Sequence, residues 1–98
     1  MIRSFRDSGT DDIFNGADTK RARRTCPSSI WHVARRKLEL LDSARTLDDL
    51  RVPAANRLEA LKKERSGQHA IRVNAQYRVC FVWSEQGPTD VEVVDYHS

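Results

Sequence analysis

The side chains that could do chemistry in this 98-residue chain lie mainly in its second half. They are a series of bases with one acid among them and a short polar terminus, namely Arg57, Glu59, Lys62, Lys63, Arg65, Arg72, Arg78, Asp95, Tyr96 and His97. An arginine on a strand is a rigid donor to phosphate, and its planar fork suits bidentate contacts. The terminal Asp-Tyr-His adds an acid or base, a ring that can stack on a nucleobase, and an imidazole that changes charge near neutral pH.

Cleavage of RNA by its own 2′-hydroxyl needs groups of these kinds. That reaction requires an acceptor for the 2′ proton, a cation beside the crowded phosphate and a proton donor for the leaving 5′ oxygen, and it needs no metal. From composition alone, an exposed tail and salt-bridged strands remain the simpler interpretation of the same residues.

Motifs of other chemistries are missing from the sequence. The three histidines are scattered, none pairs with a cysteine at ligand spacing, and the four glycines are isolated from one another. We therefore expect neither a metal site nor a cofactor. Cys26 and Cys80 have no CxxC spacing, and they are expected to be reduced thiols, with Cys80 in the core.

The formal charge of +3 conceals a segmented distribution. Residues 20–38 carry seven basic and no acidic side chains, and residues 51–78 carry seven basic and two acidic ones. Residues 79–98, by contrast, carry four acidic side chains and no Lys or Arg. One basic block would be read as a solvated face, but two on a short chain favour an anionic partner with a phosphate backbone. Arg35 and Arg36 of the first block join the candidates for such contacts.

The spacing of apolar residues predicts the elements that must position these groups. A helix is expected from Pro27, because Ile30, Val33, Ala34, Leu38 and Leu41 form one stripe. A second, short helix is expected at residues 46–50, and residues 11–14 could form one helical turn. The basic stretch 19–25 is expected to be a loop or a mobile segment.

Alternating patterns predict strands at residues 57–61, 69–74, 77–83 and 90–96, with a weaker N-terminal strand at residues 2–5. The tight connection 74–76 makes a hairpin of the second and third. Arg72 and Arg78 would then share one sheet surface, opposite Ile71, Tyr77 and Phe81. Residues 1–98 should form a single α+β domain with helices on one face of a twisted antiparallel sheet.

The targeting features expected of secreted and membrane proteins are not found. The N-terminus has no apolar stretch after its first basic residue, and no apolar run is long enough to span a bilayer. We expect a cytoplasmic protein with no membrane partner.

Several segments of the sequence resemble the HigB family, the toxins of host-inhibition-of-growth toxin–antitoxin modules within the RelE/ParE superfamily. The similar segments are MIRSF at 1–5, RLEAL at 57–61, GQH at 67–69, IRVNAQYRVCF at 71–81 and VEVVDYH at 91–97. The resemblance spans nearly the whole chain, and it is weakest over residues 7–29.

This resemblance implies a RelE/ParE-like fold and a ribosome-dependent endoribonuclease that enters the A site and cuts translated mRNA without a cofactor. It implies three partners: ribosomal RNA, a HigA-like helix-turn-helix antitoxin, and operator DNA reached through that antitoxin. By position, Arg78 would stabilise the phosphate and Lys62 would contact it or the nearby backbone. Asp95, Tyr96 and His97 would form the C-terminal part of the site, with His97 as an acid or base.

One position departs from the better-known branch of that family, which has a histidine in the strand before the lysine. This sequence has Glu59 there. Arg57, Lys62 and Lys63 favour the ionised carboxylate, which makes Glu59 a weak base or a structural ion-pair partner. A slower nuclease is therefore expected.

Two rival functions remain open at the level of the sequence, because one fold can host several activities. The first is a ParE-like protein that inhibits DNA gyrase without cutting RNA. The second is a catalytically inactive member that only tunes repression by its antitoxin. The terminal Asp95-Tyr96-His97 and the basic strand residues favour the nuclease.

Overall fold

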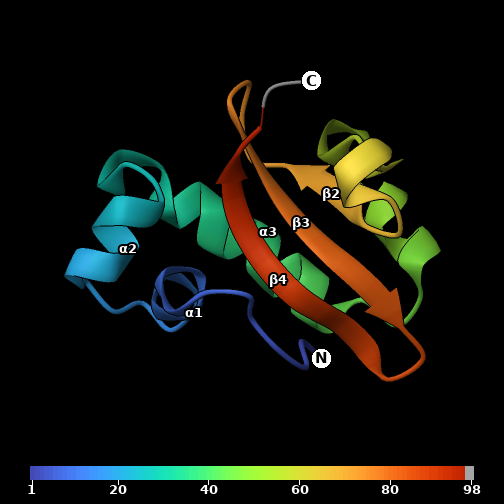
Figure 1. The fold of residues 1–98 in the computed structure, drawn as a ribbon, viewed down its shortest axis with the longest axis horizontal. Coiled ribbons are helices and arrows are strands. Elements are labelled where there is room, and N and C mark those ends of the chain that lie inside the picture. Colours follow the sequence, from blue (N-terminus) through green and yellow to red (C-terminus); the bar gives the residue numbers. More distant parts are fainter. Residues whose placement is uncertain (97–98) are drawn as a thin grey trace.

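The computed structural model describes residues 1–96, in which helices pack against an antiparallel sheet (Figure 1). The α-helices are α1 (Ser8–Phe14), α2 (Lys20–Thr25) and α3 (Trp31–Ser43). Four short 3-10 helices are η1 (Ser28–Ile30), η2 (Leu47–Arg51), η3 (Ala54–Asn56) and η4 (Lys63–Arg65). No helix in the described part of the chain is long and apolar enough to cross a membrane.

The sheet has four antiparallel strands in the order β1-β2-β3-β4. The strands are β1 (Glu59–Ala60), β2 (His69–Arg72), β3 (Tyr77–Ser84) and β4 (Gly87–Asp95). The α+β class and the predicted hairpin of β2 and β3 are thus confirmed. β1 is shorter than expected, and β4 begins earlier than expected, at Gly87.

The two faces of the sheet differ in what covers them. Ile71, Val79 and Phe81 are buried against α3, which contributes Leu38 and Leu41 to the main core. Figure 1 shows α3 behind the sheet and α1 beside β4. On the opposite face a small cluster of Leu61, Ala70 and Cys80 is buried, with Val94 and Tyr96 packed against it. Most of the helical cover therefore lies on one face, as the strand alternation predicted.

The helices predicted from Pro27 and at residues 46–50 are confirmed as α3 and η2, with one difference at the start of α3. Ser28–Ile30 forms the 3-10 turn η1, and the α-helix proper begins at Trp31. In η2, Thr46 and Asp49 form a capping box, in which each side chain accepts a hydrogen bond from the other residue's backbone N–H. Two backbone N–H groups at the helix start are thereby satisfied.

The expected N-terminal strand is reduced to one bridging residue. Phe5 pairs with Val91 of β4 in parallel orientation, and the Arg6 N–H donates to the Val91 carbonyl oxygen at 2.9 Å. Pairing stops there because Asp7 already caps α1, where its side chain accepts from the Thr10 N–H at 2.6 Å.

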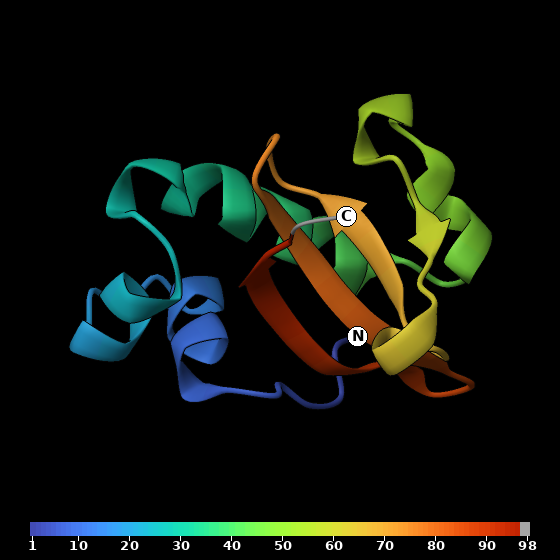
Figure 2. The same ribbon diagram turned by 45° about the horizontal axis from the view of Figure 1, so that its top comes forward.

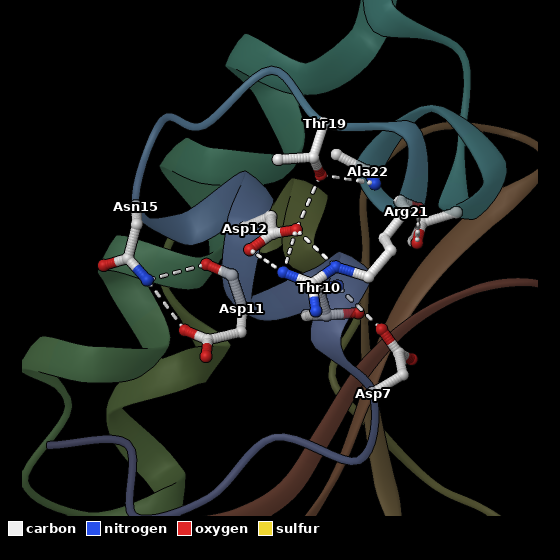
Figure 3. Close-up of polar contacts among 9 residues, drawn as sticks. Asp7, Thr10, Asp11, Asp12, Asn15, Thr19, Arg21 and Ala22 are labelled. Carbon is white, nitrogen blue, oxygen red and sulfur yellow. Dashed lines mark hydrogen bonds and ion pairs between the residues drawn. The ribbon is translucent and has the colours of Figure 1, made fainter.

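The prediction of a loop at residues 19–25 is wrong, because Lys20–Thr25 forms α2. Thr19 caps this helix and also donates to Asp12, and Arg21 pairs with the same carboxylate at 3.0 Å (Figure 3). Arg23 pairs with Asp18. Acidic residues of the N-terminal segment therefore neutralise part of the first basic block and hold a helix that local periodicity does not reveal.

Candidate functional site

A cleft of about 730 Å³ lies where β1, the η4 turn and the end of β4 meet. Its lining residues are Glu59, Ala60, Leu61, Lys62, Lys63, Glu64, Arg65, Asp95 and Tyr96. Figure 2 shows β1 at the sheet edge beside β2, with η4 following it. The cleft therefore joins residues from 59–65 with residues at the end of the sheet, and these are two of the groups that the sequence nominated.

Lys62, Lys63 and Glu59 of the cleft are exposed. Neither Lys62, Lys63 nor Glu59 forms an ion pair within 4 Å of another described residue. Glu59 thus lines the same cleft as Lys62 without the structural ion pair that was one expectation for it. The ammonium groups have no carboxylate partner among the described residues, and so they are available to an anionic ligand.

Arg65 is held in place by the buried carboxylate of Glu92. Its Nη1 donates to Oε1 of Glu92 at 2.8 Å and to the side-chain oxygen of Gln68 at 3.0 Å. The hydrogen bond to Glu92 raises the pKa of Arg65 above its ordinary value, although burial acts against it. Glu92 is only 9% exposed, and Arg6 approaches its other oxygen at 3.8 Å. Arg65 is therefore a fixed cation, unlike the two lysines.

Sequence reasoning missed Glu92, and we expect it to be worth a measurable part of the stability. Glu92→Gln keeps an acceptor but removes the charge, so the free energy of unfolding should fall by about 1–2 kcal/mol. Urea denaturation measures this change. Glu85→Gln in an exposed turn is the control, with an expected change within about 0.5 kcal/mol.

A double-mutant cycle with Arg65→Met tests whether the effect comes from this pair. Residues in contact should show a coupling energy of about 0.5 kcal/mol or more. Strict additivity of the two substitutions would contradict the assignment.

Arg78 lies next to the turn of the β2–β3 hairpin, beside the cleft. Its Nη1 donates to the Asn74 carbonyl oxygen at 2.7 Å and to the Tyr77 carbonyl oxygen at 3.3 Å. Its guanidinium carbon lies 5.9 Å from the centre of the Tyr96 ring, a distance typical of a cation–π contact. Arg72 is its direct cross-strand partner, so both lie on the face that the alternation predicted. The guanidinium is oriented before any ligand arrives.

The β2–β3 turn ties the end of β4 to this arginine. The Asn74 side-chain oxygen accepts from the N–H groups of Gln76 and Tyr77 at 2.8 and 2.7 Å, which fixes the turn. Gln76 then donates to a side-chain oxygen of Asp95 at 2.9 Å, and its carbonyl oxygen accepts from the Tyr96 N–H at 2.9 Å. Asp95 and Tyr96 are thereby held next to Arg78. His97 lies outside the described residues.

The roles of Asn74 and Gln76 were not predicted from the sequence either. The short polar connection 74–76 was interpreted only as a turn, although asparagine in a tight turn is a recognised signal for side-chain bonding to the backbone. Glu92 had no comparable local signal, because its partner Arg65 is distant in the sequence.

The remaining candidates do not line the cleft. Arg36, Arg57 and Arg72 line a separate groove between α3, η3 and β2. Arg35 lies against Gly16 at the end of α1. The candidate residues therefore form two clusters and one isolated position instead of a single site.

The thiols take no part in the cleft. Cys80 is buried beneath it in the cluster with Leu61 and Ala70, and burial raises its pKa to about 11. Burial likewise raises the pKa of Cys26, in the main core, to about 11. Both are free thiols, and the complete burial of Cys80 confirms its predicted place in the core. Among residues 1–96, no group of three or more His, Cys, Asp or Glu side chains is placed to hold a metal ion.

Comparison with known proteins identifies the family of the chain. Residues 3–97 match the family described as RelE-like toxin of type II toxin-antitoxin system HigB. The chain is 43% identical over 83 residues to Toxin HigB-1 of Vibrio cholerae serotype O1, covering 85% of this chain and 84% of that protein. It is 33% identical over 94 residues to an uncharacterized protein of Haemophilus influenzae, covering 96% and 89% of the two chains. The chain belongs to the HigB-like family of RelE-like toxins of type II toxin–antitoxin systems.

Proposed function

We propose that this toxin is a ribosome-dependent endoribonuclease that cleaves translated mRNA in the A site through attack by the RNA's own 2′-hydroxyl. The observation that carries the proposal is the meeting of Lys62, Arg65, Asp95 and Tyr96 around one open cleft, with Arg78 oriented against the tyrosine ring. Such an open cleft suits a substrate that a large partner presents.

The proposed mechanism assigns a role to each of these groups. Arg78 and Lys62 stabilise the negative charge that accumulates on the phosphate during attack, and the guanidinium of Arg78, which is already oriented, costs little reorganisation. Tyr96 stacks on the base next to the cut. Asp95 and His97 are the candidates for moving the 2′ proton and for protonating the 5′ oxygen.

The partners follow from membership in a toxin–antitoxin module. A toxin of this family has a cognate antitoxin. We propose that the antitoxin is HigA-like, with a helix-turn-helix through which the pair binds operator DNA. Action on ribosomes would place the toxin in the cytoplasm.

Primer extension on mRNA from expressing cells tests the proposed reaction. Cuts phased with the reading frame are expected. DNA damage without such cuts would instead support the rival interpretation, a non-nucleolytic inhibitor of DNA gyrase. Antitoxin binding with neither cuts nor DNA damage would indicate a catalytically inactive member.

Glu59→His should accelerate cleavage about tenfold, a part of the 10²–10⁴-fold that a well-placed general base contributes. Glu59 already lines the cleft with Lys62, so an imidazole at this position would stand beside the phosphate-binding groups and titrate near neutral pH. The rate is measured in single turnover on programmed ribosomes.

Glu59→Gln is the matched control for this substitution, because it removes the carboxylate without supplying a base. A cleavage rate of Glu59→His that equals or falls below the wild-type rate would show that Glu59 does not limit the reaction.

A further inference from the structure

A second concave surface, which we call the basic groove, carries more positive charge than the cleft. It has a volume of about 450 Å³, and the four cations that line it are Arg36, Lys37, Arg57 and Arg72. They come from α3, from the residue after η3 and from β2. No acidic side chain is among the lining residues, so the groove concentrates charge of one sign.

The arginines of the basic groove have no acidic partner among the described residues. Arg21 and Arg51 are each paired with a neighbouring aspartate. Within residues 1–96, none of Arg36, Arg57 and Arg72 forms an ion pair within 4 Å. Three unpaired guanidiniums in a hollow repel one another, and an anion placed among them would relieve that repulsion.

The groove is also held in shape by a buried polar side chain. Asn56 is fully buried, and its amide donates to the carbonyl oxygens of Leu50 and Val52 at 3.1 and 3.4 Å. Its side-chain oxygen accepts from Nζ of Lys37 at 2.6 Å. The pKa of Lys37 is lowered by its burial and by the neighbouring Arg36 charge. Asn56 therefore holds the loop that carries Arg57 against α3, and it also fixes the ammonium group of Lys37.

The basic groove adjoins the candidate site through the hairpin turn. Asn74 lines the groove, and its carbonyl oxygen accepts the 2.7 Å hydrogen bond from Arg78. Arg72, on the groove, is the direct cross-strand partner of Arg78. A polyanion bound at Arg78 can therefore continue into the groove without crossing an acidic surface formed by these residues.

We propose that the basic groove binds the phosphate backbone of the RNA strand that is cut, next to the phosphate held by Arg78. This inference rests on the proposed function and adds to it a second binding site on the same strand. Arginine forks match phosphate oxygens bidentately, and a row of phosphates offers one acceptor to each guanidinium. An acidic peptide of the antitoxin is the main competing occupant, and the test distinguishes it from RNA.

The test measures RNA binding without cleavage. Single-stranded RNA of three or nine nucleotides, blocked by 2′-O-methyl groups and labelled with a fluorophore, is titrated with the full chain by anisotropy between 50 and 200 mM KCl. Each phosphate neutralised in a single strand contributes about 0.7 to the slope of log affinity against log salt. The groove variant Arg36→Ala/Arg57→Ala should therefore lower the slope for the nine-nucleotide RNA by about 1.4, with an affinity loss of about tenfold. The three-nucleotide RNA should be bound as by the wild type.

The matched control is Lys20→Ala/Arg24→Ala, which removes the same charge from exposed positions on α2 that are outside the groove. We expect its RNA affinity to equal that of the wild type. Circular dichroism establishes that both variants are folded.

Four results would overturn the proposal. In the groove variant, these are an unchanged salt slope, a loss of antitoxin affinity while RNA affinity is intact, and a loss of affinity only for ribosomes that carry no mRNA. The fourth is an equal loss of RNA affinity in the control variant. Cleavage of unmodified mRNA on ribosomes is measured separately with the wild-type chain. If the groove variant binds RNA like the wild type, the proposed nuclease function still stands. If the wild-type chain does not cleave mRNA, the RNA-binding result can still be interpreted.

Discussion

Arg78→Ala is expected to reduce ribosome-dependent mRNA cleavage by about 10²–10³-fold, the usual loss when one preorganised donor to a developing oxyanion is removed. The reason lies in how the guanidinium is held. Two backbone carbonyl oxygens of the hairpin and the Tyr96 ring orient it before substrate binds. Water that fills the space left by an alanine would have to reorganise during the reaction, whereas the arginine does not.

Arg78→Lys separates charge from geometry in the same experiment. A lysine keeps the positive charge but cannot reproduce the planar fork, so most of the loss should remain. Arg51→Ala is the control, because Arg51 belongs to η2, pairs with Asp48 and does not line the cleft.

The rate is measured in single turnover, and affinity for the antitoxin is measured on the same preparations. A wild-type rate in Arg78→Ala would remove this residue from the mechanism. An equal loss in Arg51→Ala would point to general charge reduction instead.

Phe81→Ala should cost about 3–5 kcal/mol of folding free energy, the range observed when a buried aromatic side chain is truncated. Phe81 is completely buried in β3, stacks on His69 and belongs to the core between sheet and α3. A domain of this size is stabilised by only about 5–15 kcal/mol in total, so the variant should be close to unfolding.

Urea denaturation measures the loss, with Phe81→Leu as the conservative control. A leucine retains most of the volume and should cost less than about 1.5 kcal/mol. If Phe81→Ala lost no more stability than Phe81→Leu, the packing described for β3 would be wrong. Because β3 also carries Arg78, the alanine variant should lose toxicity through unfolding alone.

Local patterns in the sequence were sufficient to predict those parts of the fold that depend on near neighbours. The apolar stripe of α3, the short helix after it and the alternation through β2 and β3 all act over a few residues, and the structure agrees with each of them. Alternation alone placed Arg72 and Arg78 on one face, because side chains of a strand point to opposite sides in turn. Segmental charge counts also identified the two basic stretches, although not their division into a cleft and a groove.

In the two segments that were predicted wrongly, residues outside the segment decide the local structure. α2 has few apolar residues, and its ion pairs and cap involve Asp12 and Asp18 from outside the helix. The N-terminal strand is limited to Phe5 because Asp7 starts a helix immediately after it. Neither outcome follows from periodicity within the segment itself.

The candidate site shows the same division. Side-chain chemistry alone predicted candidates for phosphate chemistry, namely Lys62, Arg65, Arg78, Asp95 and Tyr96. Only the tertiary structure placed Lys62 and Arg65 in one cleft with the end of β4, gave Arg65 its buried partner Glu92, and moved Arg36 and Arg57 to a second groove. The physical reason is that propensity and periodicity act between residues a few positions apart. Contacts between segments tens of residues apart depend on how the strands pair and how the helices pack on them, and no spacing rule within either segment encodes that arrangement.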